Sequence, residues 1–178
     1  MTVRAGEPFD LARTAAEVAA LLTAPLPAAG PTVAEGDPDT GEWRATTGEG
    51  FRAVPLWESG DDGDRDDPDE AEEEAEALLD ALVAELETRW GPHHRVAVHV
   101  ALLLREEGTP VPPLFDALLD EDCYGDLAAW GPLPGPEDRP GDRWAGVSVG
   151  RSDGDAPLVM AAVVSDRPIA APPPPAWL

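Results

Sequence analysis

The clearest alternation of apolar and polar positions lies between residues 68 and 90. Apolar side chains recur there at steps of three and four, the spacing of one face of a helix, at Ala71, Ala75, Leu78, Leu82, Leu86 and Trp90. Asp67 and Pro68 suit the N-cap and first turn of such a helix, and Gly91 suits its end. Acidic residues fall elsewhere on the helical wheel and crowd the first half. We therefore predict one long acidic amphipathic helix.

The segment Arg95–Leu104 is apolar at almost every position. A strand that is buried on both faces has this character, and the segment is interpreted as a central strand. His99 falls within it, among small apolar residues. We expect a core histidine bonded to a backbone or hydroxyl group rather than a metal ligand or a base.

Shorter patterns predict the remaining elements. A first helix, capped by Asp10 or by Thr14, extends to about Ala24, where prolines end it. Pro113 begins a short helix that ends at Asp120.

Two hairpins are also predicted, the first from alternating positions and the second from two apolar arms around a longer loop. One joins Glu42–Thr46 to Phe51–Trp57, and Pro55 makes its second arm an edge strand or ends it early. The other joins Trp144–Val149 to Leu158–Val164.

Together these elements predict an α+β domain with a mixed or antiparallel sheet of about five strands, one long acidic helix and one or two shorter helices. The expected organisation is a loose N-terminus (1–8), a single domain (9–168) with an acidic loop (58–67), and a Pro-rich tail (169–178). Residues 26–39 and 120–142 are expected to be irregular. Two helices cover only one sheet face, so the other face needs Pro-rich loops or another chain.

Composition limits the weight of several residue types. All 12 basic residues are Arg, and the chain has no Lys, Asn or Gln. This usage is typical of a GC-rich bacterium, so the abundant Ala, Pro and Arg carry less functional information. The single cysteine excludes an internal disulfide, and neither a signal peptide nor a membrane helix is indicated. We expect a cytoplasmic protein.

The charge of the chain narrows the class of partner. The 36 acidic residues give a net charge of -24, which argues against direct binding to nucleic acid or to anionic membranes. The same charge favours solubility or a basic partner.

Candidate catalytic motifs lack the context that their chemistry needs. Residues 146–150 read Gly-Val-Ser-Val-Gly, but a hydrolase elbow around Ser148 requires a following helix and a downstream His. His93, His94 and His99 show no metal-binding spacing, and Cys123 is flanked by acids that oppose thiolate formation. We expect no catalytic residue, metal or cofactor.

The most prominent remaining feature is the run of eleven carboxylates between Asp61 and Glu76. It is either a solvated surface or a patch that docks on a basic protein. The predicted partner-binding residues are Asp61, Asp62, Asp64, Asp66, Asp67, Asp69, Glu70, Glu72, Glu73, Glu76, Tyr124, Trp130 and Trp177. The leading hypothesis is a non-enzymatic interaction protein of the immunity, antitoxin or inhibitor kind. The alternatives are a homo-oligomeric accessory domain joined through the sheet face and a His/carboxylate metal enzyme.

Overall fold

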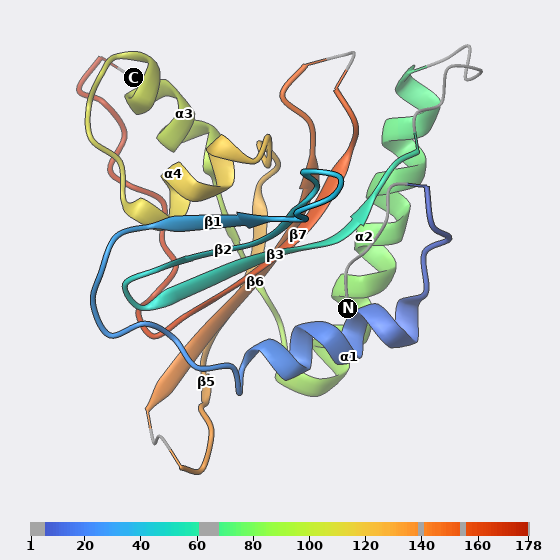
Figure 1. Ribbon diagram of the computed structural model, residues 1–178, viewed down its shortest axis with the longest axis horizontal. Coiled ribbons are helices and arrows are strands. Elements are labelled where there is room, and N and C mark those ends of the chain that lie inside the picture. Colours follow the sequence, from blue (N-terminus) through green and yellow to red (C-terminus); the bar gives the residue numbers. More distant parts are fainter. Residues whose placement is uncertain (1–5, 61–67, 139–140, 154–155, 178) are drawn as a thin grey trace.

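The computed structural model describes residues 6–60, 68–138, 141–153 and 156–177, which contain four helices and one seven-stranded sheet (Figure 1). The helices are α1 (Leu11–Leu21), α2 (Pro68–Trp90), α3 (Val98–Glu106) and α4 (Pro113–Asp120). The strands are β1 (Val33–Gly36), β2 (Trp43–Gly48), β3 (Phe51–Glu58), β4 (His94–Val96), β5 (Leu127–Pro134), β6 (Asp142–Gly150) and β7 (Val159–Ser165).

The sheet has the order β1-β2-β3-β7-β6-β5-β4, and each neighbouring pair is antiparallel. The predicted α+β class is confirmed, with an antiparallel sheet. Seven strands in the described residues replace the five or so that we predicted.

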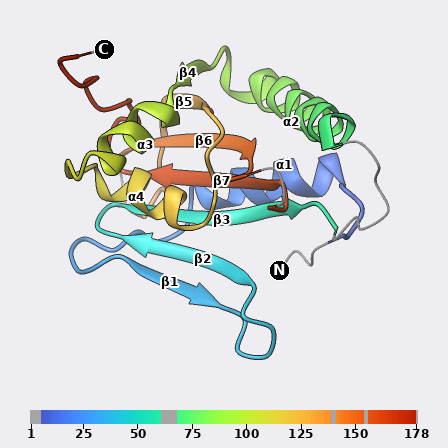
Figure 2. The same cartoon turned by 90° about the horizontal axis from the view of Figure 1, so that it is seen from above.

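Helices cover both faces of the sheet (Figures 1 and 2). On one face, α1 and α2 pack over a cluster that includes Met160 and Val164 of β7. On the other face, α3 and α4 pack over a cluster that includes Ala161 and Val163. Strand β7 is buried at every position because its alternating side chains enter both cores. The expectation that one face needs loops or another chain is therefore wrong.

One of the helices that cover the second face, α3, lies in the segment that we predicted to be a central strand. Strand β4 ends at Val96, and residues 98–106 form α3. Val98, Ala101 and Leu104 are buried at helical spacing, whereas the His99 side chain is 61% exposed. The predictions of a central strand and of a core histidine at this position are both wrong, because a uniformly apolar run fits a strand and a buried helix equally well.

Two strands lie in segments that we expected to be irregular. Strand β1 pairs with β2 at the edge of the sheet, and β5 lies between β4 and β6. The Gly and Pro residues around these short stretches are typical of loops. Hydrogen bonding to neighbouring strands from other parts of the chain outweighs that local preference.

Both predicted hairpins are present, as β2–β3 and β6–β7. Strand β3 is internal, however, since it also pairs with β7, so the prediction of an edge strand is wrong. Its pairing with β2 ends at Ala53, and its register with β7 shifts after Pro55. The missing N–H of Pro55 thus lies where the ladder is already interrupted.

The predicted helices α1, α2 and α4 are confirmed. Asp10 is the N-cap of α1, and its side chain accepts a hydrogen bond from the N–H of Arg13 at 3.0 Å. Thr14 lies inside the helix, which ends at Leu21 rather than near Ala24. In the described part of the chain, no helix combines the length and the hydrophobicity that a membrane crossing requires.

Candidate functional site

Helix α2 presents two opposite faces. Ala75, Leu82 and Leu86 are fully buried against the sheet, and Leu78, Leu79 and Val83 pack at the border of the same core. The opposite face carries seven exposed carboxylates, at Asp69, Glu70, Glu72, Glu73, Glu74, Glu76 and Asp80. We call these seven residues the acidic face. The buried stripe fixes the rotation of the helix, so the acidic face is held toward solvent.

The end of α2 is held by contacts from outside the helix. Gly91 has a positive φ of 79°, and its N–H donates to the carbonyl oxygen of Glu87 at 2.9 Å, as in a glycine-terminated helix. The indole N–H of Trp130 on β5 donates to the carbonyl oxygen of Gly91 at 2.9 Å. These contacts fix the position of the helix end and, with it, the position of the acidic face.

Within the described part of the chain, the acidic face is only partly neutralised. Glu72 forms an ion pair with Arg151 at 3.0 Å, and the Arg151 side chain is largely buried. Glu70, Glu73, Glu76 and Asp80 form no hydrogen bond or ion pair with side chains in the described ranges. Their charges are thus available to a partner, without an internal ion pair to break first.

Part of the acidic face borders a groove of about 400 Å³ between α2 and the segment before β5. Glu72, Glu76 and Asp80 line it from the helix, and Tyr124 lines it from the opposite wall. The structure thus brings together three of the predicted partner-binding residues: Glu72, Glu76 and Tyr124. Arg95, which also lines the groove, is engaged by Asp126, with Nε and Oδ2 2.8 Å apart.

The other predicted residues are not gathered at this surface. Asp61, Asp62, Asp64, Asp66 and Asp67 lie outside the described residues. Trp130 is only 2% exposed and lies in the core under α2. Trp177 is 62% exposed in the C-terminal tail, where its indole N–H donates to Glu107. The described part of the candidate surface is therefore the acidic face together with Tyr124.

The three histidines have separate partners. Nδ1 of His93 lies 2.8 Å from Oε1 of Glu87, and this hydrogen bond lowers the pKa of Glu87. Nε2 of His94 lies 3.4 Å from the carbonyl oxygen of Ile169. Nδ1 of His99 lies 3.8 Å from Oδ1 of Asp126. Within the described residues, no group of three or more His, Cys, Asp or Glu side chains is placed to hold a metal ion.

Two residues from the candidate catalytic motifs are buried. Ser148 lies within β6 at 1% exposure, and its hydroxyl has no hydrogen-bond partner among the described atoms. Burial raises the pKa of the Cys123 thiol, and the neighbouring carboxylates of Glu121 and Asp122 raise it further. The expected effect of the acids on Cys123 is present, but desolvation is the larger cause. A buried thiol with a raised pKa is a poor nucleophile.

A second acidic region lies between the end of α4 and strands β2 and β3. Glu42, Glu58, Asp120, Glu121 and Asp122 line a hollow of about 200 Å³ there. Burial raises the pKa of Glu58, and nearby Glu42 adds to that effect. Glu42 and Glu58 are far in the sequence from the run Asp120–Asp122, so no single run marked the whole hollow.

No family model, curated protein or solved structure matches this chain. The protein is therefore described by its fold alone. It has an antiparallel sheet between two helical layers, with an acidic helix face turned to solvent.

Proposed function

We propose that this protein binds a basic protein partner through the acidic face of α2, in the manner of an immunity, antitoxin or inhibitor protein. The observation that carries the proposal is the row Glu70, Glu73, Glu76 and Asp80. These carboxylates are exposed and have no partner among the described residues, on a helix whose opposite face is anchored in the core.

The energetics of docking favour such a row. Residues 70 to 80 span about 15 Å along the helix axis at 1.5 Å per residue, which is long enough to meet several cations of a partner at once. Because the helix is anchored, little backbone ordering is needed on binding. The net charge of -24 adds long-range attraction that accelerates encounter with a basic surface.

The nature of the partner follows from the same charges. A surface rich in Arg and Lys complements carboxylates directly, and many such surfaces otherwise bind nucleic acid. An acidic protein that covers one would block that binding, which is the action of an inhibitor. Nucleic acid itself is disfavoured as a partner because its phosphates would be repelled.

The alternative of a homo-oligomer joined through the sheet face gains no support from the fold. Both faces of the central strands are covered by helices of the same chain, although β1 at the edge is exposed at every position. A metal enzyme likewise has no cluster of candidate ligands among the described residues to support it.

The proposal is tested by capture of partners from the native lysate with two tagged variants. The acidic-face variant carries Glu70→Gln, Glu73→Gln, Glu76→Gln and Asp80→Asn. The control variant carries Glu35→Gln, Glu106→Gln, Glu137→Gln and Asp138→Asn, four exposed acids elsewhere on the surface. Both variants lose four charges, so they differ only in where the charge is removed.

The expected result is one stoichiometric basic protein that wild type and the control variant capture at low salt. The acidic-face variant should fail to capture it, and about 0.5 M salt should release it, because screening then acts within a few ångströms. Capture of no basic protein, or equal loss with both variants, would remove the proposal.

A further inference from the structure

A groove of about 540 Å³ lies between α1 and strands β2 and β3. It is separate from the acidic face of α2. One wall is formed by Glu17 and Leu21 of α1 and by Ala24, which follows the helix, and the floor includes Arg52 and Val54 of β3. The groove is of the size that small-molecule sites have.

The register of the sheet places Arg52 on the floor of this groove. Arg52 is paired with Thr47 of β2 and with Val164 of β7, and directly paired residues point to the same face of a sheet. Val164 belongs to the core under α1 and α2. Arg52 therefore extends from the face that α1 covers, although α1 leaves it partly open to solvent.

Arg52 also stands apart from the other arginines of the chain. Seven of the nine arginines in the described ranges form ion pairs: Arg13, Arg44, Arg89, Arg95, Arg105, Arg151 and Arg167. Arg143, the eighth, is 8% exposed and does not line the groove. Arg52 is thus the one described arginine that lines a cavity and has no ion-pair partner, in a chain with 36 acids and 12 bases.

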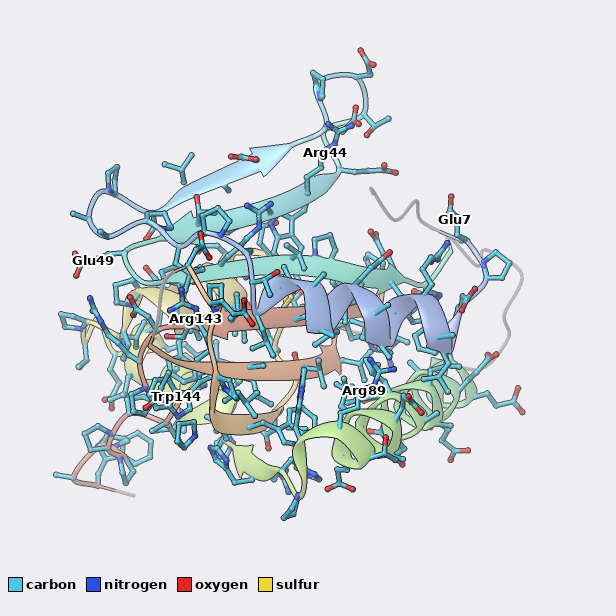
Figure 3. The ribbon with its side chains drawn as sticks, turned by 90° about the horizontal axis from the view of Figure 1, so that it is seen from below. Glu7, Arg44, Glu49, Arg89, Arg143 and Trp144 are labelled. Carbon is cyan, nitrogen blue, oxygen red and sulfur yellow. The ribbon has the colours of Figure 1, made fainter. Side chains whose placement is uncertain are left out.

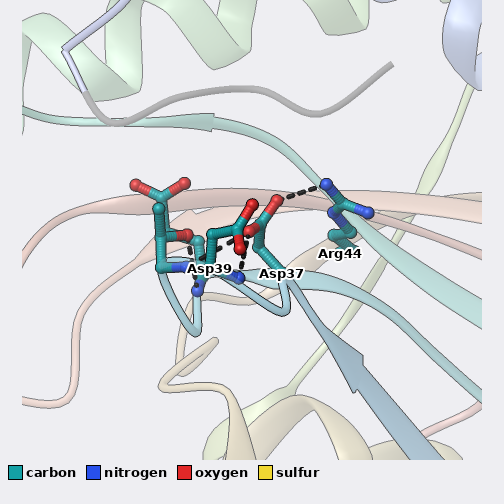
Figure 4. Close-up of polar contacts among 5 residues, drawn as sticks. Asp37, Asp39 and Arg44 are labelled. Atoms are coloured by element: carbon teal, nitrogen blue, oxygen red, sulfur yellow. Dashed lines mark hydrogen bonds and ion pairs between the residues drawn. The ribbon is translucent and has the colours of Figure 1, made fainter.

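The remaining charges of the groove are arranged around Arg52. Arg44 lines the groove but pairs with Asp37 (Figure 4). The Asp37 carboxylate also accepts from the N–H groups of Asp39 and Thr40, which help to lower its pKa. Glu17 lies 3.9 Å from Arg13. The guanidinium of Arg52 is therefore the cation that is free to take a ligand.

We propose that this groove binds a small organic acid whose carboxylate pairs with Arg52 and whose apolar body lies along Leu21 and Val54. Arginine holds a carboxylate through two parallel N–H donors, and the apolar lining residues suit a hydrocarbon body. A singly charged carboxylate matches one guanidinium, whereas a phosphate dianion would meet more repulsion from Glu35, which also lines the groove. This site is independent of the proposed partner surface.

The probe that tests this site is octanoate, compared with octanol, octylammonium and octyl phosphate. Binding is measured by calorimetric titration of the full chain, together with amide NMR shifts for residues 17–24 and 44–55. The matched control for Arg52→Gln is Arg89→Gln, because Arg89 lies on α2, away from Arg44 and β2 (Figure 3). Circular dichroism of both variants verifies that they fold.

The expected result is that octanoate binds, shifts the groove residues, and loses about tenfold in affinity with Arg52→Gln, the loss of one charge-assisted contact. Arg89→Gln should leave the affinity unchanged, and octanol should bind about tenfold more weakly than octanoate. Moderate salt should strengthen octanoate binding, since it screens the net charge of -24, whereas it weakens capture of a basic partner.

Four results would overturn the proposal: no octanoate binding, equal affinity for octylammonium, an unchanged affinity in Arg52→Gln, or a preference for octyl phosphate of more than about tenfold. None of these results bears on the acidic face of α2. The proposal for the groove and the proposed function can therefore fail independently of each other.

Discussion

At the scale of single residues, the decisive contacts join segments that are far apart in the sequence. Oδ1 of Asp126 accepts a hydrogen bond from the N–H of Val98 at 2.9 Å, and Nε1 of Trp130 donates to Gly91. Asp10 caps α1 through a contact with Arg13, only three residues along the chain. Such a local contact could be predicted from the sequence. Because the cap of α3 comes from 28 residues away, no local pattern marked where that helix begins.

Asp126 is expected to stabilise the start of α3. Replacement by Ala leaves the N–H of Val98 without its partner and should lower the free energy of unfolding by about 1–2 kcal/mol. Asp126→Asn should cost less, because an amide oxygen can still accept from Val98. The measurement is urea unfolding at pH 7, and equal losses in the two variants would contradict this account of the cap.

The contribution of Asp126 should also depend on pH. Burial raises the pKa of Asp126, but hydrogen bonds from Arg95 and from the N–H of Val98 outweigh this effect, so the pKa is lowered overall. A lowered pKa in the folded state means that the stabilisation is present above the ordinary aspartate pKa and is lost as the pH falls through the folded value. The difference between wild type and Asp126→Ala should therefore shrink below about pH 4.

Cys123 should be unreactive in the folded protein. The residue is 1% exposed and its pKa is raised, so modification requires unfolding. Against a thiol reagent at pH 8, the native protein should react at least about a thousandfold more slowly than the urea-unfolded chain. A native rate close to the unfolded rate would show that the thiol is accessible.

At the scale of elements, the predictions succeeded where periodicity and caps agree. Helix α2 combines apolar steps of three and four with a terminating Gly91, and α1 follows an Asp10 cap. The predictions failed where the pattern is uniform or interrupted. Residues 98–104 are apolar at every position except His99, and the Pro and Gly around β1 and β5 hide strands that form only through pairing with their neighbours.

The packing of α2 on the sheet is tested by truncating its buried stripe. Leu82 is fully buried, whereas Leu79 lies at the border of the core. Leu82→Ala should cost about 2–5 kcal/mol of unfolding free energy, and Leu79→Ala should cost clearly less. Similar small losses at both positions in urea unfolding would mean that α2 is not anchored as described.

At the scale of the whole molecule, the two candidate sites differ in how far the sequence reveals them. The acidic face is a local run on one helix, so charge and periodicity marked it. The groove at Arg52 exists because α1 lies beside β2 and β3. Arg52 stands out in it because nearly all other described arginines form ion pairs. Both facts belong to tertiary structure, so no sequence pattern identified Arg52.

The most direct test of the central claim is the association rate of the captured basic partner as a function of ionic strength. The comparison uses wild type, the acidic-face variant and the matched control variant in stopped-flow mixing. Electrostatic steering by the acidic face predicts a steep fall of the wild-type rate with salt. It also predicts a slower rate with a shallower salt dependence for the acidic-face variant and a rate close to wild type for the control. Equal rates and equal salt dependence in the two variants would contradict the account, because the partner would then respond to total charge alone.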